Sequence, residues 1–175
     1  MSTDSSAARG VATMKIAVLA AAAALAVGSA WAQLPLPPGQ GAGVHSPDSP
    51  VAPLPQRKDV VPWSLLTTIQ TRSEKNRVLP VFNKEQLALN QKPQRVQGFM
   101  MPLEPGEKQT HFLLTSVPLT CAFCTPGGPE SMVEVKTRTP IAYTMEPLVV
   151  EGRFATLAND EHGLYYRMTD AVAVR

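Results

Sequence analysis

The residues best suited to chemistry are Cys121 and Cys124, the only cysteines of the chain, which form a Cys-x-x-Cys motif. Prolines at 118, 126 and 129 flank the motif, and Gly127-Gly128 follows it, which predicts a shaped loop between two strands. Two sulfurs at this spacing have three possible uses. They can bind one metal ion, exchange between dithiol and disulfide, or form a structural disulfide.

Metal binding is the leading hypothesis. Thiolates bind Zn²⁺ and Cu⁺ strongly, so a zinc or copper ion is the expected cofactor. Because two sulfurs rarely suffice, we expect His111 and His162 to complete a Cys₂His₂ set with Cys121 and Cys124. The spacing of these four residues matches no standard zinc finger. Thioethers also suit Cu⁺, but the methionines in or beside the predicted strands are typical of core filler: Met100, Met101, Met132 and Met168.

The two alternatives stay open. Thiol–disulfide exchange usually needs a thiol whose pKa is lowered by a helix N-terminus or a cation. Thr125-Pro126 directly follows the motif and disfavours a helix there, because the residue before proline avoids the helical region. A structural disulfide within a non-catalytic interaction module is the third hypothesis. The closed loop is short, so the expected entropic stabilisation is modest.

Other classes of function find little support. The sequence contains no phosphate-binding loop, no Gly-x-Ser-x-Gly and no His-Glu-x-x-His, and we predict no reaction for it. Sixteen Lys and Arg residues nearly balance 14 Asp and Glu residues. Such a balance argues against a nucleic-acid-binding groove.

The N-terminus predicts export. Lys15 precedes the uncharged apolar run Ile16–Val27, and Ala30-Trp31-Ala32 is typical of a cleavage site. We therefore predict a secretory signal peptide over residues 1–32, cleaved between Ala32 and Gln33, and a periplasmic product. Translation from Met14 would give a more typical signal peptide. No second long apolar run follows, so the mature chain should have no transmembrane segment.

The mature chain divides into a tether and a domain. Residues 33–62 hold eight of the seventeen prolines, which predicts a semi-rigid or disordered tether. The domain is expected over residues 63–175. Its predicted elements are a helix near 62–73, extended residues 78–82, and a short helix capped by Asn83 and Gln86.

Five strands must then position the cysteine loop. They are expected near 96–103, 109–117, 132–136, 148–157 and 164–174, with the loop between the second and third. Gly98, inside the first strand, predicts a bulge or a close backbone approach. The fold class is mostly β, a small five-stranded barrel of the oligonucleotide/oligosaccharide-binding type with one or two short N-terminal helices. A small β-sandwich is the alternative.

The order of motifs also resembles an uncharacterised family of exported bacterial proteins, known only as a domain of unknown function. The resemblance rests on Val96-x-Gly98-Phe-Met-x-Pro102-Leu103, Phe112-Leu-Leu114, the Cys-x-x-Cys motif and Gly127-Gly-Pro129, and it covers residues 63–175. It implies a small, exported, mostly β domain. It also implies metal-related transport in the bacterial envelope, with an envelope protein or a transporter component as the partner.

Overall fold

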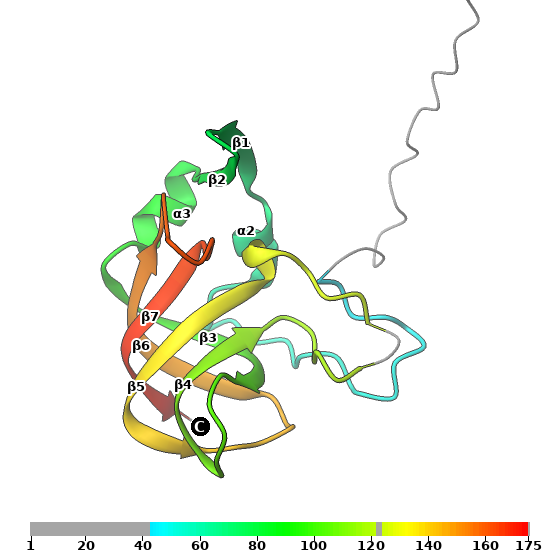
Figure 1. Cartoon of the computed structure of the whole chain (residues 1–175). Helices are drawn as coiled ribbons and strands as arrows, with labels where there is room; N and C mark the ends of the chain where they lie inside the picture. Colours follow the sequence, from blue (N-terminus) through cyan, green and yellow to red (C-terminus); the bar gives the residue numbers. More distant parts are fainter. Residues whose placement is uncertain (1–42, 122–123, 175) are drawn as a thin grey trace, which may run out of the picture. The chain divides into compact units, whose positions relative to one another are not determined.

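A computed structural model describes residues 43–121 and 124–174, and the following account is confined to them. The expected signal peptide and residues 33–42 of the expected tether lie outside this range. The described chain is mostly β, with a closed barrel, a separate two-stranded sheet and short helices (Figure 1). No helix in it is long and apolar enough to cross a membrane.

The barrel consists of five strands in the spatial order β3-β4-β5-β7-β6, closed by pairing of β3 with β6. All neighbours are antiparallel except β5 and β7, which are parallel. The predicted five-stranded barrel is confirmed, and two of its strands are longer than expected. Their bounds are β3 Lys92–Pro102, β4 Lys108–Thr115, β5 Met132–Ala142, β6 Leu148–Thr156 and β7 Tyr166–Val174.

Apolar side chains from all five strands fill the barrel. The interior includes several fully buried residues: Phe112, Leu114, Val133, Val135, Val150, Phe154, Tyr166 and Met168. Tyr166 is the only one with a polar end, and its hydroxyl donates to the Leu66 carbonyl oxygen at 2.8 Å. This hydrogen bond satisfies a buried hydroxyl and fixes the helical segment over one end of the barrel.

Gly98 is a point of close approach between β3 and β4, as predicted. A Cβ atom at this position would lie 2.7 Å from both the Leu114 Cγ and the Thr115 carbonyl oxygen. Carbon and oxygen atoms cannot pack at that distance without a shift of the backbone. Glycine is therefore required here for steric reasons, and the strand that continues to Met101 depends on it.

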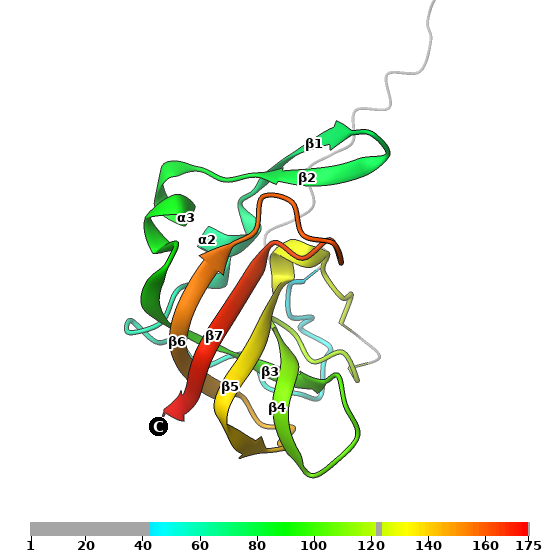
Figure 2. The ribbon, with the colours of Figure 1, turned by 60° about the vertical axis from the view of Figure 1, so that its left-hand side comes forward.

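Two short helices and a hairpin precede the barrel. Helix α2 spans Trp63–Thr67, strands β1 and β2 span Gln70–Glu74 and Arg77–Val81, and helix α3 spans Lys84–Leu89. The hairpin projects from the helical end of the barrel (Figure 2). The capping box of Asn83 and Gln86 is confirmed, with both reciprocal hydrogen bonds at 2.9 Å.

The predicted helix over 62–73 is wrong beyond Thr67. Thr67, Thr68 and Ile69 are β-branched and lose side-chain freedom in a helix, whereas strands accommodate them. The next residues instead form β1, which turns into β2 through Lys75 and Asn76, both with positive φ. A two-residue loop of this conformation matches the twist of a hairpin.

Residues 43–62, assigned to the tether from the sequence, run along the barrel. The Val61 backbone amide donates to the Arg95 carbonyl oxygen at 2.8 Å, and the Val61 side chain is buried. Asp59 forms an ion pair with Arg95, which also contacts Glu151. These contacts link the tether to β3 and β6, next to the point where α2 begins.

Candidate functional site

Cys121 and Cys124 are joined by a disulfide bond, with their Cα atoms 5.3 Å apart. Both residues are buried, with exposures of 8% and 6%, and they pack with Val117 in a small cluster separate from the barrel core. Ser49, from the tether, places its hydroxyl oxygen 3.1 Å from the Cys121 Sγ. The bonded sulfurs offer no thiolate to a metal ion, so the structure favours a structural disulfide over metal binding.

The two histidines of the expected metal set, His111 and His162, contact carboxylates rather than the cysteines. The His111 Nε2 lies 2.8 Å from the Glu134 Oε1, and the largely exposed His162 lies beside Glu161. Within the described ranges, no three His, Cys, Asp or Glu side chains are grouped so that they could hold a metal ion. The four-residue metal set stays a prediction.

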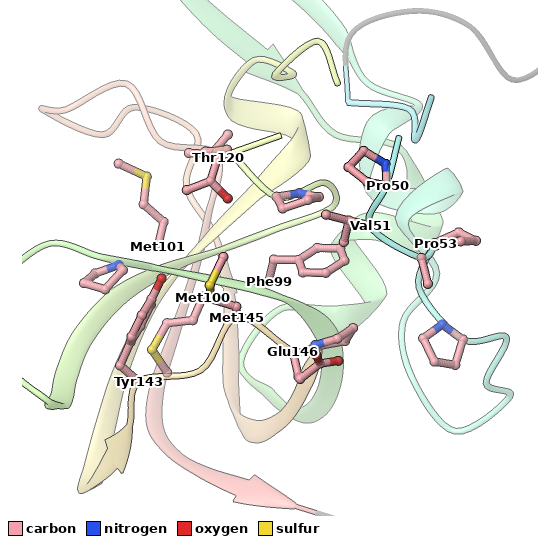
Figure 3. A pocket seen from close by; sticks show the side chains of 16 residues that line it. Pro50, Val51, Pro53, Phe99, Met100, Met101, Thr120, Tyr143, Met145 and Glu146 are labelled. Carbon is pink, nitrogen blue, oxygen red and sulfur yellow. The ribbon is translucent and has the colours of Figure 1, made fainter. Parts of the chain in front are cut away.

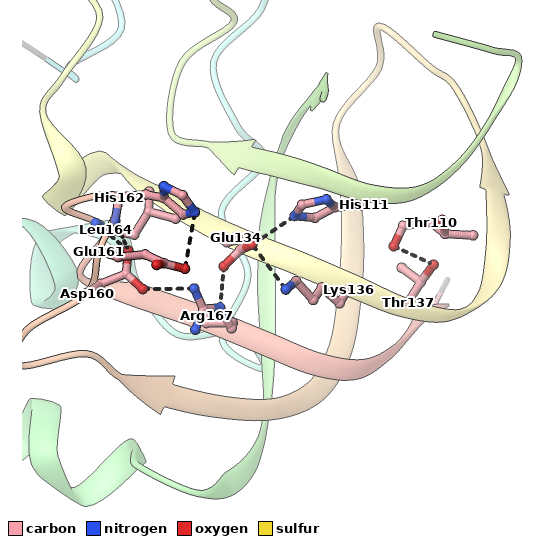
Figure 4. A network of polar contacts seen from close by, with 10 residues as sticks. All are labelled: Thr110, His111, Glu134, Lys136, Thr137, Asp160, Glu161, His162, Leu164 and Arg167. Carbon is pink, nitrogen blue, oxygen red and sulfur yellow. Dashed lines mark hydrogen bonds and ion pairs between the residues drawn. The ribbon is translucent and has the colours of Figure 1, made fainter. Parts of the chain in front are cut away.

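Glu134 instead centres a network of charged side chains on the outside of the barrel (Figure 4). Its side chain is only 5% exposed and contacts Arg167, His111 and Lys136. Arg167 continues the network to Asp160 at 2.9 Å, a carboxylate that also accepts from the backbone amides of Leu164 and His162. The network ties β4, β5 and β7 to the turn that precedes β7.

This network predicts acid sensitivity. Burial alone would raise the pKa of Glu134, but hydrogen bonds and ion pairs with Arg167, His111 and Lys136 outweigh burial and lower it. The pKa of Asp160 is also lowered, because the amides of Leu164 and His162 and the Arg167 guanidinium outweigh its burial. A carboxyl group whose folded-state pKa is depressed stabilises the fold above its unfolded-state pKa. That stabilisation disappears as the pH falls through the folded-state value.

We therefore expect the melting temperature to fall as the pH drops below the ordinary pKa values of glutamate and aspartate side chains, 4.5 and 3.8. Thermal melts between pH 7 and pH 2.5 would measure this. Glu134→Gln should flatten the decline, whereas Glu107→Gln, at an exposed turn, should leave it unchanged. Equal pH slopes for the wild type and Glu134→Gln would contradict the assignment.

An open groove of about 530 Å³ lies beside the disulfide. Four segments distant in sequence line it: 50–55 of the tether, 99–102 of β3, 118–120 before Cys121, and 143–147 between β5 and β6. Figure 3 shows the side chain of Met101 on one side of the β3 ribbon, and those of Tyr143 and Met145 on the other. We call this the barrel-end groove.

The barrel-end groove is mainly apolar but open to solvent. Tyr143 is 44% exposed and Met145 is 65% exposed, and Glu146 adds a carboxylate beside them. Sequence reasoning missed the groove, because no segment lining it carries a catalytic or metal-binding motif. The prolines of the tether were the one sequence signal of the groove, and the sequence predicted only a tether from them.

Comparison with known proteins identifies a family of unknown function. The family model described as "Protein of unknown function (DUF3299)" matches residues 31–171. A crystal structure of a DUF3299 family protein from Pseudomonas aeruginosa PAO1 shares 25% sequence identity, with a TM-score of 0.43. That similarity covers 55% of this chain and 68% of the other. No curated protein matches the chain.

The matched residues include the whole proline-rich tether, the Cys-x-x-Cys loop and the barrel as far as Ala171 in β7, which agrees with the resemblance noted from the sequence. Because the family model covers most of its length, the chain belongs to the DUF3299 family of proteins of unknown function.

Proposed function

We propose that this protein is an exported, non-catalytic binding module. Its barrel-end groove receives an apolar, extended segment of a protein partner in the bacterial envelope. Export and the envelope location rest on the signal peptide expected from the sequence. The disulfide serves as a structural support for the groove.

The observation that carries the proposal is the groove itself. Tyr143 and Met145 are large apolar side chains that remain exposed where they line the groove. Contiguous exposed apolar surface of this kind marks interaction sites, and Tyr and Met are enriched at protein interfaces. Methionine also adapts its shape to different apolar partners.

The walls of the groove indicate the chemistry of the partner. Prolines from the tether, from β3 and from the loops supply rigid apolar surface without backbone N–H donors. Recognition must therefore depend on side-chain packing more than on strand pairing. The Glu146 carboxylate forms no ion pair within the described chain, and it favours a partner with a basic residue next to its apolar ones.

The disulfide fits this role better than catalysis does. A disulfide that cycles in catalysis must be attacked rapidly and repeatedly by thiolates, and burial of both Cys121 and Cys124 slows such attack without preventing reduction. The bond instead fixes the chain immediately after Leu119 and Thr120, which line the groove. Metal delivery would require both sulfurs as free thiolates, so it calls for the reduced protein.

The test is a selection of 12-residue peptides displayed on phage against the purified mature chain, followed by fluorescence anisotropy with each selected peptide. Met145→Lys should weaken binding by at least about tenfold, because burial of an apolar side chain contributes about 1.5–3 kcal/mol. Val78→Lys is the matched control. Val78 is 58% exposed on the hairpin, outside the barrel-end groove, and should not affect binding.

Two results would contradict the proposal. One is a selection that yields no binding peptide, and the other is a set of peptides that bind Met145→Lys as tightly as the wild type.

The same protein preparation tests the metal hypothesis. Stoichiometric zinc bound by the reduced wild type and lost in Cys121→Ser/Cys124→Ser would favour metal binding over the structural role.

A further inference from the structure

The tether contacts the cysteine loop at several points, which makes the groove depend on the disulfide. We define the strap as residues 43–55. The Gly43 backbone amide donates to the Thr125 carbonyl oxygen at 2.8 Å, and the Gly43 carbonyl oxygen accepts from the Ser116 hydroxyl at 2.9 Å. With Ser49 against Cys121, the strap is attached to the chain on both sides of the disulfide.

Packing at the start of the strap is very close. A Cβ atom on Gly43 would lie 2.2 Å from the Ser131 hydroxyl oxygen, and one on Gly127 would lie 2.1 Å from the same oxygen. The Gly127 Cα would also lie 3.4 Å from the Gly43 Cβ. The start of the strap therefore packs closely against the Ser131 side chain and is in van der Waals contact with the Gly127 backbone. Movement of the cysteine loop would change these contacts.

The strap and the cysteine loop both line the barrel-end groove. Pro50, Val51 and Pro53 of the strap line it together with Leu119 and Thr120, which immediately precede Cys121. A change at the disulfide thus reaches the groove along two routes. One runs through the backbone of the cysteine loop, and the other runs through the Ser49 contact.

Reduction of the disulfide would change the space that the sulfurs occupy. Bonded sulfurs are about 2.05 Å apart, whereas non-bonded heavy atoms keep about 3.5–4.0 Å apart. Both cysteines are buried, and Val117 and Ser49 pack against them. The added separation must displace a neighbour. The strap has no strand hydrogen bonds to hold it, whereas Val117 lies two residues beyond β4 and its carbonyl oxygen accepts from the buried Thr115 hydroxyl.

We propose that the Cys121–Cys124 disulfide is a redox-sensitive latch that holds the strap and so controls the barrel-end groove. A protein dithiol supplies two electrons and two protons. The sulfur–sulfur bond breaks, Cys121 and Cys124 become thiols, and the donor is oxidised to its own disulfide. Control of ligand binding rests on the proposed function, but release of the strap does not. By thermodynamic linkage, a peptide that binds only the oxidised protein would also make the disulfide harder to reduce.

Hydrogen exchange measured by mass spectrometry tests the latch without any ligand, using the mature chain oxidised and after reduction with dithiothreitol. Amides of the strap should exchange about tenfold faster in the reduced protein, because local opening costs less there. Amides of β5 and of the β1–β2 hairpin should not change. Cys121→Ser/Cys124→Ser should reproduce the reduced pattern. Ser49→Ala, which keeps the disulfide, should lie between the two states.

The latch is refuted if strap exchange is the same in both redox states. It is equally refuted if β5 and the hairpin accelerate together with the strap, since the disulfide would then support the whole fold. Neither result depends on a bound peptide. A failed peptide selection combined with faster strap exchange would therefore reject the proposed function and retain the latch.

Discussion

Replacement of Glu134 by alanine should lower the free energy of unfolding by about 3 kcal/mol, because it removes one of the two buried carboxylates that pair with the Arg167 guanidinium and leaves only Asp160. Glu134 is almost fully buried, and it receives hydrogen bonds from both Arg167 and His111. Arg167 is 25% exposed, so water can compensate for part of the lost interaction. Urea denaturation at pH 7 would measure the change.

Glu107→Ala is the matched control for this prediction, since Glu107 is exposed in the turn between β3 and β4. Its unfolding should match that of the wild type within about 0.5 kcal/mol. Glu134→Gln, which keeps the shape but removes the charge, should fall between the two. If Glu134→Ala unfolds at the same urea concentration as Glu107→Ala, the network contributes nothing measurable to stability.

Gly98→Ala should be comparably destabilising, by about 3 kcal/mol, because overpacking against backbone cannot be relieved by a change of rotamer. The new methyl group would meet the Thr115 carbonyl oxygen and the Leu114 side chain, both at 2.7 Å. Separation of β3 from β4 would also displace the part of the barrel-end groove that β3 provides. Thermal unfolding followed by circular dichroism would measure the loss.

Gly163→Ala provides the comparison for that substitution. Gly163 has a φ of +75° and no atom within 4 Å of an added Cβ, so alanine there costs only backbone strain, about 1 kcal/mol. The difference between the two variants isolates the steric clash. Equal stability of Gly98→Ala and Gly163→Ala would show that β3 and β4 can move apart without cost.

The barrel was predictable because its signals are local. Met132–Lys136 alternates apolar and polar residues, Leu148–Leu157 is rich in β-branched and apolar residues, and turn residues separate the strands. Both strands were therefore recognisable without knowledge of their neighbours. The capping box of Asn83 and Gln86 was recognisable for the same reason. The β1–β2 hairpin was missed because Trp63, Leu66 and Ile69 have helical spacing, and the turn at Lys75-Asn76 lacks the usual glycine.

The candidate site was only partly predictable. The Cys-x-x-Cys loop was identified as the feature of interest, but the sequence left its use open between metal, exchange and structural disulfide. His111 was grouped with the cysteines because it lies near the second predicted strand, which leads to the cysteine loop. In the barrel, however, its closest partner is Glu134, across the β4–β5 pairing. That pairing depends on strand register, which no single segment specifies.

Local sequence patterns were sufficient for features whose causes lie within a few residues: the strands, the capped helix, the apolar N-terminal run and the cysteine pair in one loop. Which of these features lie next to one another depends on tertiary packing. It placed the strap against the disulfide, Glu134 beside Arg167, and four distant segments around one groove. The physical reason is that these contacts join residues tens of positions apart, and their geometry follows from barrel closure and packing rather than from local preference.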